Sequence, residues 1–253
     1  KIKIALTFVS EEKKIRIVVK EAEKISKLSD DVVEISVESL SGVTTKKTIK
    51  ASEIVELGDI AKSDIGKMKS FIPEYASEAI LESAVKEGKI SGYKMLSGEP
   101  LSIIKSSDTH VLAFAQDGKS VFVFEKSKVI LKEGKVASYS QTLGELDRFA
   151  IIDGKPIIIE AKSGYYNGVT GFEGKIEPGR LKRSKITPVA DVYGVDPEIM
   201  LVAPKGETAG KYVVDFQKTL GGSVVELSQT PGELTKMGNA LDEGYRILKG
   251  GVR

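Results

Sequence analysis

The sequence predicts an α/β fold in which a mixed β-sheet is flanked by helices, preceded by a small N-terminal α/β domain. Two observations predict it. Short β-branched runs of strand length alternate with stretches of helical periodicity, and glycine or proline marks the boundaries between them. The chain has 253 residues, enough for one large or two small domains. Pro73 is the predicted boundary, so the expected domains are residues 1–72 and residues 73–253.

The first 72 residues are predicted to form a β-α-β unit. Residues 1–9 alternate as a strand, residues 11–28 have apolar side chains at helical spacing, and residues 32–40 alternate again. A polar stretch follows, with a short helix near residues 59–68. We expect this domain to act in sensing or in dimerisation.

The next region is predicted to be a helix followed by two hairpins. Ser77 is expected to cap a helix that Gly88 ends. Alternating runs around turn residues then predict two β-hairpins, which are residues 110–115 with 121–124 and residues 128–131 with 136–139.

The last hundred residues alternate strand and helix after a third hairpin. That hairpin turns at Asp153-Gly154, a strong two-residue turn signal. Residues 163–179 are glycine-rich and predict a loop, and residues 180–193 predict a basic helix that Pro188 interrupts or restarts. The remaining elements are strands at 198–203 and 223–227 and helices at 208–220 and 231–248.

The composition excludes several classes of site. The chain has no cysteine, which excludes disulfides, thiol catalysis and cysteine-bound zinc. Its one histidine, His110, lies in an apolar strand and is expected to be structural, which argues against histidine-rich metal sites. The net charge of +2 gives no global preference for a partner.

The composition also indicates a cytoplasmic protein with no membrane segment. No apolar run approaches the roughly 20 residues that span a bilayer, and the opening segment is too short and too soon acidic for a secretory signal. Richness in lysine, glutamate and isoleucine fits a thermophile.

The third hairpin brings four charged side chains to one face of the sheet. With the turn at Asp153-Gly154, Asp147 lies opposite Glu160 and Glu145 lies opposite Lys162. Because side chains alternate with a period of two, all four project the same way. A register shift of one pair keeps them on that face.

This cluster suits a divalent cation. Glu160 follows Ile157-Ile158-Ile159, and a charge on such a buried strand is costly unless it is paired or bound to metal. Two neighbouring carboxylates repel each other, and oxygen ligands suit Mg²⁺ or Mn²⁺. The alternative is a cross-strand cluster of salt bridges on a solvated face.

Asp147 followed thirteen residues later by Glu160-Ala161-Lys162 resembles the PD-(D/E)xK nuclease superfamily. Archaeal Holliday junction resolvases and many restriction endonucleases belong to it. The resemblance covers the hairpin, the preceding helix and the following helix-strand pattern, and implies a restriction-endonuclease-like mixed β-sheet flanked by helices. Two features depart from the pattern: Glu145-Leu146 replaces the usual proline, and the segment from the preceding helix to Asp147 is long.

The resemblance implies a metal site. Asp147 and Glu160 would bind Mg²⁺ or Mn²⁺, with the backbone carbonyl of Ala161 as a further ligand. An acidic residue on the preceding helix often completes the site in that family, and Glu78 or Glu82 match this role.

Three further residues receive roles beside the metal. Lys162 would position or deprotonate the attacking water and stabilise charge on the phosphate. Glu145 would contact the metal ligands without binding the metal itself. Alternatively, it would form a salt bridge with Lys162, and Lys162 would then be a structural residue. Gln217 would orient a phosphate or water, with an ordinary surface glutamine as the alternative.

Nucleic-acid contacts are predicted just after the hairpin. Between Lys162 and Pro188 there are six basic residues and two acidic ones, enough to follow a phosphate backbone. The candidate contacts are Tyr165, Tyr166, Lys175, Arg180, Lys182, Arg183 and Lys185. A solvated helix face and a plain surface loop are the alternatives.

We therefore expect a Mg²⁺- or Mn²⁺-dependent nuclease that hydrolyses phosphodiester bonds in nucleic acid, with DNA as the first substrate to test. Endonuclease and exonuclease action are both open, and so is a homodimer. The alternative function is a catalytically inert nuclease-like module that binds nucleic acid or a protein partner.

Overall fold

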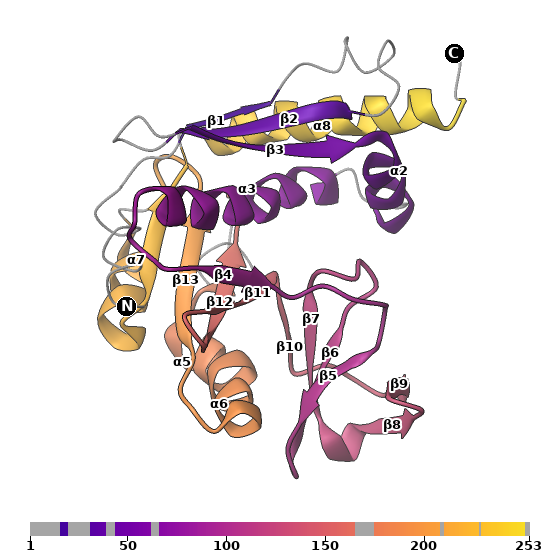
Figure 1. Cartoon of the computed structure of the whole chain (residues 1–253), viewed down its shortest axis with the longest axis vertical. Coiled ribbons are helices and arrows are strands. Elements are labelled where there is room, and N and C mark those ends of the chain that lie inside the picture. The colour runs from indigo at the N-terminus through magenta and orange to yellow at the C-terminus, as the bar shows by residue number, and fades with distance from the viewer. Residues whose placement is uncertain are drawn as a thin grey trace.

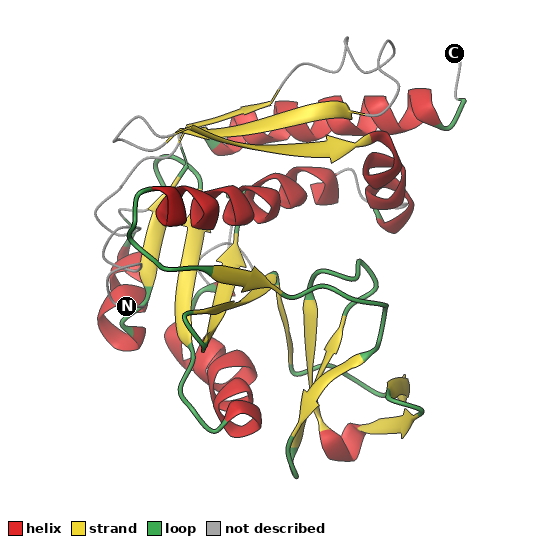
Figure 2. Ribbon diagram, viewed as in Figure 1, coloured by secondary structure: helices red, strands yellow, loops and turns green. Residues whose placement is uncertain are grey.

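A computed structural model describes residues 16–19, 31–38, 44–61, 66–164, 175–207, 210–227 and 229–250. Within them the chain has a mixed α/β fold, as predicted (Figures 1 and 2). The strands form a three-stranded sheet, a five-stranded sheet, a four-stranded sheet and a two-stranded ribbon. None of the described helices combines the length and the apolar character needed to cross a membrane.

The N-terminal strands form an antiparallel sheet in the order β1-β2-β3. Its strands are β1 (Arg16–Val19), β2 (Asp31–Glu38) and β3 (Thr44–Lys50). The helix predicted over residues 11–28 is wrong at β1, which pairs with β2 as a strand. The strand predicted at residues 1–9 and the rest of that helix lie outside the described residues.

Two helices follow, α2 (Ala51–Ile60) and α3 (Gly66–Lys86). The predicted domain boundary at Pro73 is wrong, because Pro73 lies inside α3. Ser77 is likewise no N-cap: its hydroxyl donates to the Pro73 carbonyl at 3.1 Å, one turn back in the same helix. The apolar side chains of α3 continue on both sides of the proline, and their burial holds the helix together across it.

Helix α3 lies between the N-terminal sheet and the five-stranded sheet (Figure 1). Ile35 and Ile49 from the N-terminal sheet share one hydrophobic core with Ile72 of α3 and Ile159 of the five-stranded sheet. The described parts of residues 1–72 and 73–253 are therefore packed as one body around α3.

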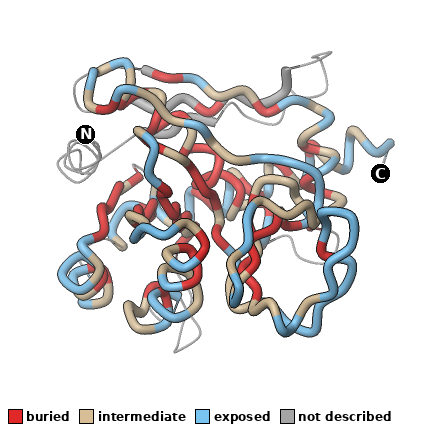
Figure 3. Tube along the Cα trace, turned by 60° about the horizontal axis from the view of Figure 1, so that its bottom comes forward, coloured by how far each residue is buried: buried red, intermediate tan, exposed pale blue. Residues whose placement is uncertain are grey.

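The five-stranded sheet has the order β14-β13-β12-β11-β4. Its strands are β4 (Tyr93–Met95), β11 (Arg148–Ile152), β12 (Lys155–Ala161), β13 (Glu198–Ala203) and β14 (Ser223–Glu226). Strands β12, β13 and β14 are parallel, and β11 is antiparallel to β4 and β12. Figure 3 shows the buried chain concentrated in the middle of the molecule.

Helices cover both faces of this sheet. Helix α8 (Pro231–Leu248) packs beside α3 on one face. The other face is covered by α5 (Pro178–Leu181), a π-helical turn η3 (Lys182–Ile186), α6 (Thr187–Tyr193) and α7 (Lys211–Leu220). Pro188 lies in the first turn of α6, but Ile186 and Thr187 keep right-handed helical backbone angles, so the chain runs from η3 into α6 without the predicted interruption.

The long segment between α3 and Asp147 forms a separate antiparallel sheet, called the inserted sheet below, with the order β10-β7-β6-β5. Its strands are β5 (Ile103–Ser106), β6 (His110–Phe114), β7 (Val121–Glu125) and β10 (Gly144–Leu146). Between β7 and β10 the chain forms η2 (Lys126–Lys128), β8 (Val129–Lys132) and β9 (Lys135–Tyr139). Both predicted hairpins, β6–β7 and β8–β9, are confirmed.

The third hairpin has the predicted register. Ile152 faces Lys155 and Arg148 faces Ile159, with positive φ at both Asp153 and Gly154 in the turn. The ladder ends at Arg148, however. Preceding it, β10 pairs with β7 instead of continuing along β12, so the chain changes sheets at Asp147.

Candidate active site

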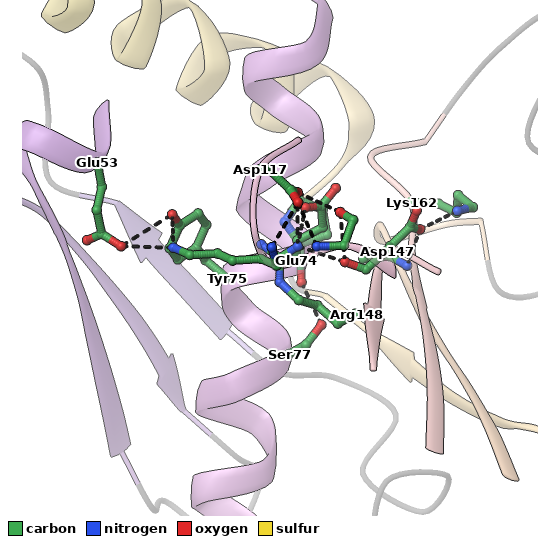
Figure 4. Close-up of polar contacts among 12 residues, drawn as sticks. Glu53, Glu74, Tyr75, Ser77, Asp117, Asp147, Arg148 and Lys162 are labelled. Carbon is green, nitrogen blue, oxygen red and sulfur yellow. Dashed lines mark hydrogen bonds and ion pairs between the residues drawn. The ribbon is translucent and has the colours of Figure 1, made fainter. Parts of the chain in front are cut away.

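Asp147, Glu160 and Lys162 meet where β10 and β11 separate and β12 ends, and Figure 4 shows Lys162 beside Asp147. The Lys162 Nζ contacts Oδ2 of Asp147 and lies 2.9 Å from Oε2 of Glu160. The three side chains predicted to share a face are therefore in direct contact.

Glu160 has no exposed surface, and two lysines compensate its charge. Lys162 contacts one carboxylate oxygen, and Nζ of Lys185 lies 2.5 Å from the other. Lys185 comes from η3, the π-helical turn packed on this face of the sheet. Burying a carboxylate is costly unless it is paired in this way.

The lysines also control the protonation of the site. Burial alone would raise the pKa of Asp147, but Lys162 and Lys185 outweigh it and hold the pKa of that carboxyl below its usual range. The backbone N–H of Ala161 donates to the same carboxylate at 2.8 Å. Burial would lower the pKa of Lys162, yet Asp147 and Glu160 raise it well above its ordinary value, so Lys162 is a cation at neutral pH.

Helix α3 contributes a carboxyl that the sequence did not single out, Glu74 (Figure 4). Burial raises the pKa of Glu74 to about 8, with Asp147 adding to the shift and Arg148 opposing it. Nη1 of Arg148 lies 2.9 Å from Oε2 of Glu74, but within the described structure that oxygen accepts no well-aligned hydrogen bond. A buried carboxyl oxygen without a well-aligned hydrogen bond can accept a further partner, such as a water or an ion.

Glu78 and Glu82, the two predicted helix ligands, point to other partners. Glu78 pairs with Lys47 of β3 at 2.6 Å, and Glu82 pairs with Lys86 at 2.9 Å. They lie one and two turns further along α3, roughly 6 and 12 Å from Glu74 along the axis. The structure therefore brings Glu74, rather than either of them, to Asp147.

The β6–β7 turn of the inserted sheet is part of the same network. Asp117 lies 3.8 Å from Arg148, and the Ser120 hydroxyl donates to the carbonyl of Asp147 at 3.4 Å. Arg148 itself donates to that carbonyl at 2.7 Å. The Asp147 backbone is thus held from two sides, by its neighbour in β11 and by the inserted sheet.

Glu145 does not lie opposite Lys162, which corrects the sequence prediction. It pairs with Phe122 of β7 because β10 has joined the other sheet. It lines a pocket of about 390 Å³ together with Glu74, Asp117 and Asp147. Partial burial of the carboxyl, together with Asp147 and Asp117, raises the pKa of Glu145 to about 7.

The predicted nucleic-acid contacts divide into three groups. Lys175, Arg180, Lys182 and Arg183 are exposed beside this face of the sheet, as a phosphate-contacting surface requires. Lys185 instead points inward to Glu160. Tyr165 and Tyr166 lie outside the described residues.

Gln217 is exposed on α7 and does not line the pocket of about 390 Å³. Its placement matches the surface glutamine that was the alternative. His110 is held by Asp191 of α6, with Nδ1 at 2.8 Å from Oδ2, which agrees with a structural histidine.

One signal in the sequence could have identified Glu74. The apolar residues Met68, Ile72, Tyr75 and Ala79 keep helical spacing through Pro73, and all are buried. Following that stripe instead of stopping at the proline extends the helix far enough to include Glu74. Arg148 and Asp117 had no comparable signal, because they meet only when the inserted sheet docks.

The carboxyl groups of Asp147, Glu160 and Glu74 offer oxygen donors of the kind that hard divalent cations prefer, and β12 ends at Ala161, whose carbonyl is another oxygen donor. In the described part of the chain, no three acidic or histidine side chains converge as a ready metal cluster. Lys162 lies between Asp147 and Glu160 and holds both.

Comparison with known proteins adds no relative. No protein-family model, no curated protein and no solved structure matches the chain. The function proposed below therefore rests on the residues and geometry of the site.

Substitution of Glu74 by glutamine should change the pH dependence of stability. Because the folded-state pKa of about 8 exceeds the ordinary value of 4.5, the native protein binds a proton that the unfolded chain releases, and stability falls as pH rises between these values. We expect the Tm of Glu74→Gln relative to wild type to increase from pH 5 to pH 8, measured by calorimetry. Glu82→Gln, on the exposed side of α3, is the control. A Tm difference for Glu74→Gln that stays constant with pH would contradict the assignment.

At a pH above the Glu74 pKa of about 8, removal of Arg148 should be partly rescued by removal of Glu74's charge. Arg148→Met leaves buried carboxylates without their cation, at a cost of about 3–5 kcal/mol in unfolding free energy. In urea denaturation, we expect the double variant Arg148→Met/Glu74→Gln to recover part of that loss. Strict additivity of the two changes would show that the pair is not coupled.

Proposed function

We propose that this chain is a Mg²⁺- or Mn²⁺-dependent nuclease of the PD-(D/E)xK type that hydrolyses phosphodiester bonds in nucleic acid, with DNA as the expected substrate. One observation carries the proposal: Asp147, Glu160 and Lys162 are in contact at the ends of adjacent strands, at a site that Glu74 of the preceding helix also reaches.

The surrounding fold supports the same reading. A helix precedes the strands β4, β11 and β12, and helices lead from β12 into the parallel strands β13 and β14. This is a mixed sheet with helices on both faces, of the kind that the superfamily resemblance implies. The inserted sheet accounts for the long segment between α3 and Asp147.

A bound cation would be held by Asp147 and Glu74, which line the same pocket, and by Glu160, which shares Lys162 with Asp147. The Ala161 carbonyl, at the end of β12, would be a further ligand. Bound there, Mg²⁺ or Mn²⁺ would polarise the scissile phosphate and lower the pKa of a coordinated water. Lys162 and Lys185 are then released from full ion pairing with Glu160 and Asp147, and their charges become available to a phosphate.

The raised pKa of Lys162 favours one of its two predicted roles. Its raised pKa makes it a poor proton acceptor, so it serves as a cation that positions and neutralises the phosphate. Lys185 is a second such cation, on the opposite side of Glu160. Exposed Arg180, Lys182 and Arg183 extend positive charge from this point along the helix surface.

A catalytically inert module is the second candidate function, favoured by a specific observation. Lys162 and Lys185 each pair with one carboxylate oxygen of Glu160, so the buried charge is compensated without a metal ion. The protein would then bind nucleic acid or a protein partner without cutting it.

Nuclease assays should separate residues at the site from their neighbours. We expect Asp147→Asn, Lys162→Ala and Glu74→Gln each to reduce cleavage by at least about a hundredfold while far-UV circular dichroism is unchanged. Glu78→Gln, one turn further along α3, is the matched control and should cut like the parent. The substrates are plasmid, linear duplex, single strand, four-way junction and RNA, each with Mg²⁺ and Mn²⁺. Full activity of Lys162→Ala would overturn the site, and loss in Glu78→Gln alone would restore the original helix assignment.

Metal titration should distinguish the nuclease from the inert module. A catalytic site binds Mn²⁺ in calorimetry and loses that binding in Glu160→Gln. Because Glu74 must give up its proton to bind a cation, and burial raises its pKa to about 8, we expect tighter binding at pH 8 than at pH 6.5. Absence of Mn²⁺ binding that Glu160→Gln alters would favour the inert module.

A further inference from the structure

The β8–β9 ribbon carries an unusual concentration of exposed apolar side chains. Ile130 is 65% exposed, Tyr139 is 41% exposed and Leu131 is 38% exposed, all within ten residues of one hairpin. Single exposed apolar side chains are normal, so what these three can contact depends on the face of the ribbon on which each one lies.

The register divides the ribbon into an inner and an outer face. A bulge between Ile130 and Leu131 keeps the pairs Val129–Tyr139 and Leu131–Val136 on the inner side. There Val136 is buried, and the Tyr139 ring packs against Phe124 with centroids 5.1 Å apart. The inner face therefore anchors the ribbon to the inserted sheet.

The outer face has no such partner in the described structure. The pairs on this side are Ile130–Ser138 and Lys132–Lys135, with the exposed Lys128 just before the strand. An apolar side chain thus sits among three lysines on a surface that adds nothing to the core.

The two lysines at the tip face each other directly across the ribbon, an arrangement that destabilises a hairpin. Lys135 pairs with Glu99 at 2.8 Å and Lys132 approaches Glu133 at 3.9 Å, but all four side chains are at least half exposed, so these pairs are weak. A polyanion would neutralise both lysines at once. Charge complementarity therefore favours nucleic acid over a second copy of the chain.

The ribbon is also within reach of the candidate active site. Figure 1 shows it at the end of the inserted sheet that lies away from α3. From Tyr139 the chain returns through β10 to Asp147, and eight residues span at most about 28 Å. One turn of B-form DNA is about 34 Å long, and its major groove admits a two-stranded ribbon.

We propose that the β8–β9 ribbon is a second nucleic-acid contact, which places Ile130 in a groove of the duplex and Lys132 and Lys135 on the flanking phosphates, while another phosphate of the same duplex occupies the site at Asp147. This inference rests on the proposed function and adds to it a substrate class, duplex DNA of about one helical turn or more.

The test is binding without cleavage. The full chain with the Asp147→Asn change is titrated, in EDTA, against fluorescein-labelled duplexes of 24 base pairs and hairpin-closed duplexes of 6 base pairs, and anisotropy is followed at several salt concentrations. The ribbon variants are Lys132→Ser/Lys135→Ser and Ile130→Ser. The matched control is Lys94→Ser/Lys155→Ser, which removes two exposed lysines from β4 and β12 of the five-stranded sheet.

For Lys132→Ser/Lys135→Ser we expect at least tenfold weaker binding of the 24-base-pair duplex and a salt slope smaller by about two, since each lost phosphate contact removes about one. Ile130→Ser should weaken binding about threefold with the slope unchanged, because no phosphate contact is lost. The short duplex should bind equally to all variants, and the control should match the parent.

Two results would overturn the ribbon's role. Unchanged binding of the 24-base-pair duplex, with ribbon variants shifting from dimer to monomer in light scattering, would make the ribbon an interface between copies. Unchanged binding with no such shift would mean that the lysines only prevent edge-to-edge pairing. Ribbon-dependent binding by a protein that cuts no substrate would support the ribbon and reject the proposed nuclease, so the two failures are distinguishable.

Discussion

The burial of Glu160 is the constraint on which the rest of this structure depends. Its carboxylate ends a strand of three consecutive isoleucines and has no contact with solvent. A buried carboxylate of this kind is costly unless cations or hydrogen-bond donors pair with both of its oxygens. Lys162 supplies one cation from the same strand and Lys185 the other from the π-helical turn packed above, so the sheet, its helix layer and the candidate site are held together by one group.

A second buried network ties the remaining parts of the molecule to the same point. Arg148 points to the α3 side of the sheet, where it meets Glu74, and it also contacts Asp117 from the inserted sheet. In Figure 4 this network runs from Glu53 of α2 to Lys162. Side chains from α2, α3 and the inserted sheet therefore all help to fix the position of Asp147.

The inserted sheet gives the molecule two regions of distinct character. Its β6–β7 turn is polar, and Asp117 lies within the buried network at the site. Its other end carries the exposed ribbon, where apolar and basic side chains face solvent together. One element thus links the charge cluster with the ribbon that we propose contacts nucleic acid.

The sequence by itself determined most of the elements after residue 110 and one face of the site. The alternation around Asp153-Gly154 was enough to place Asp147, Glu160 and Lys162 together, because strand parity follows from a local turn. The strand β13 and the helix α8 were also predicted with their observed bounds.

Only the tertiary structure decided which other groups join them. Glu74 was missed because Pro73 precedes it, and a proline usually marks a helix boundary. The packing of α3 keeps the helix continuous through Pro73. Glu145 does not lie on the predicted face, because β10 pairs with β7 and not with β12. Arg148 and Asp117 lie far from α3 in the sequence, and their meeting with Glu74 depends on long-range docking, which local periodicity does not encode.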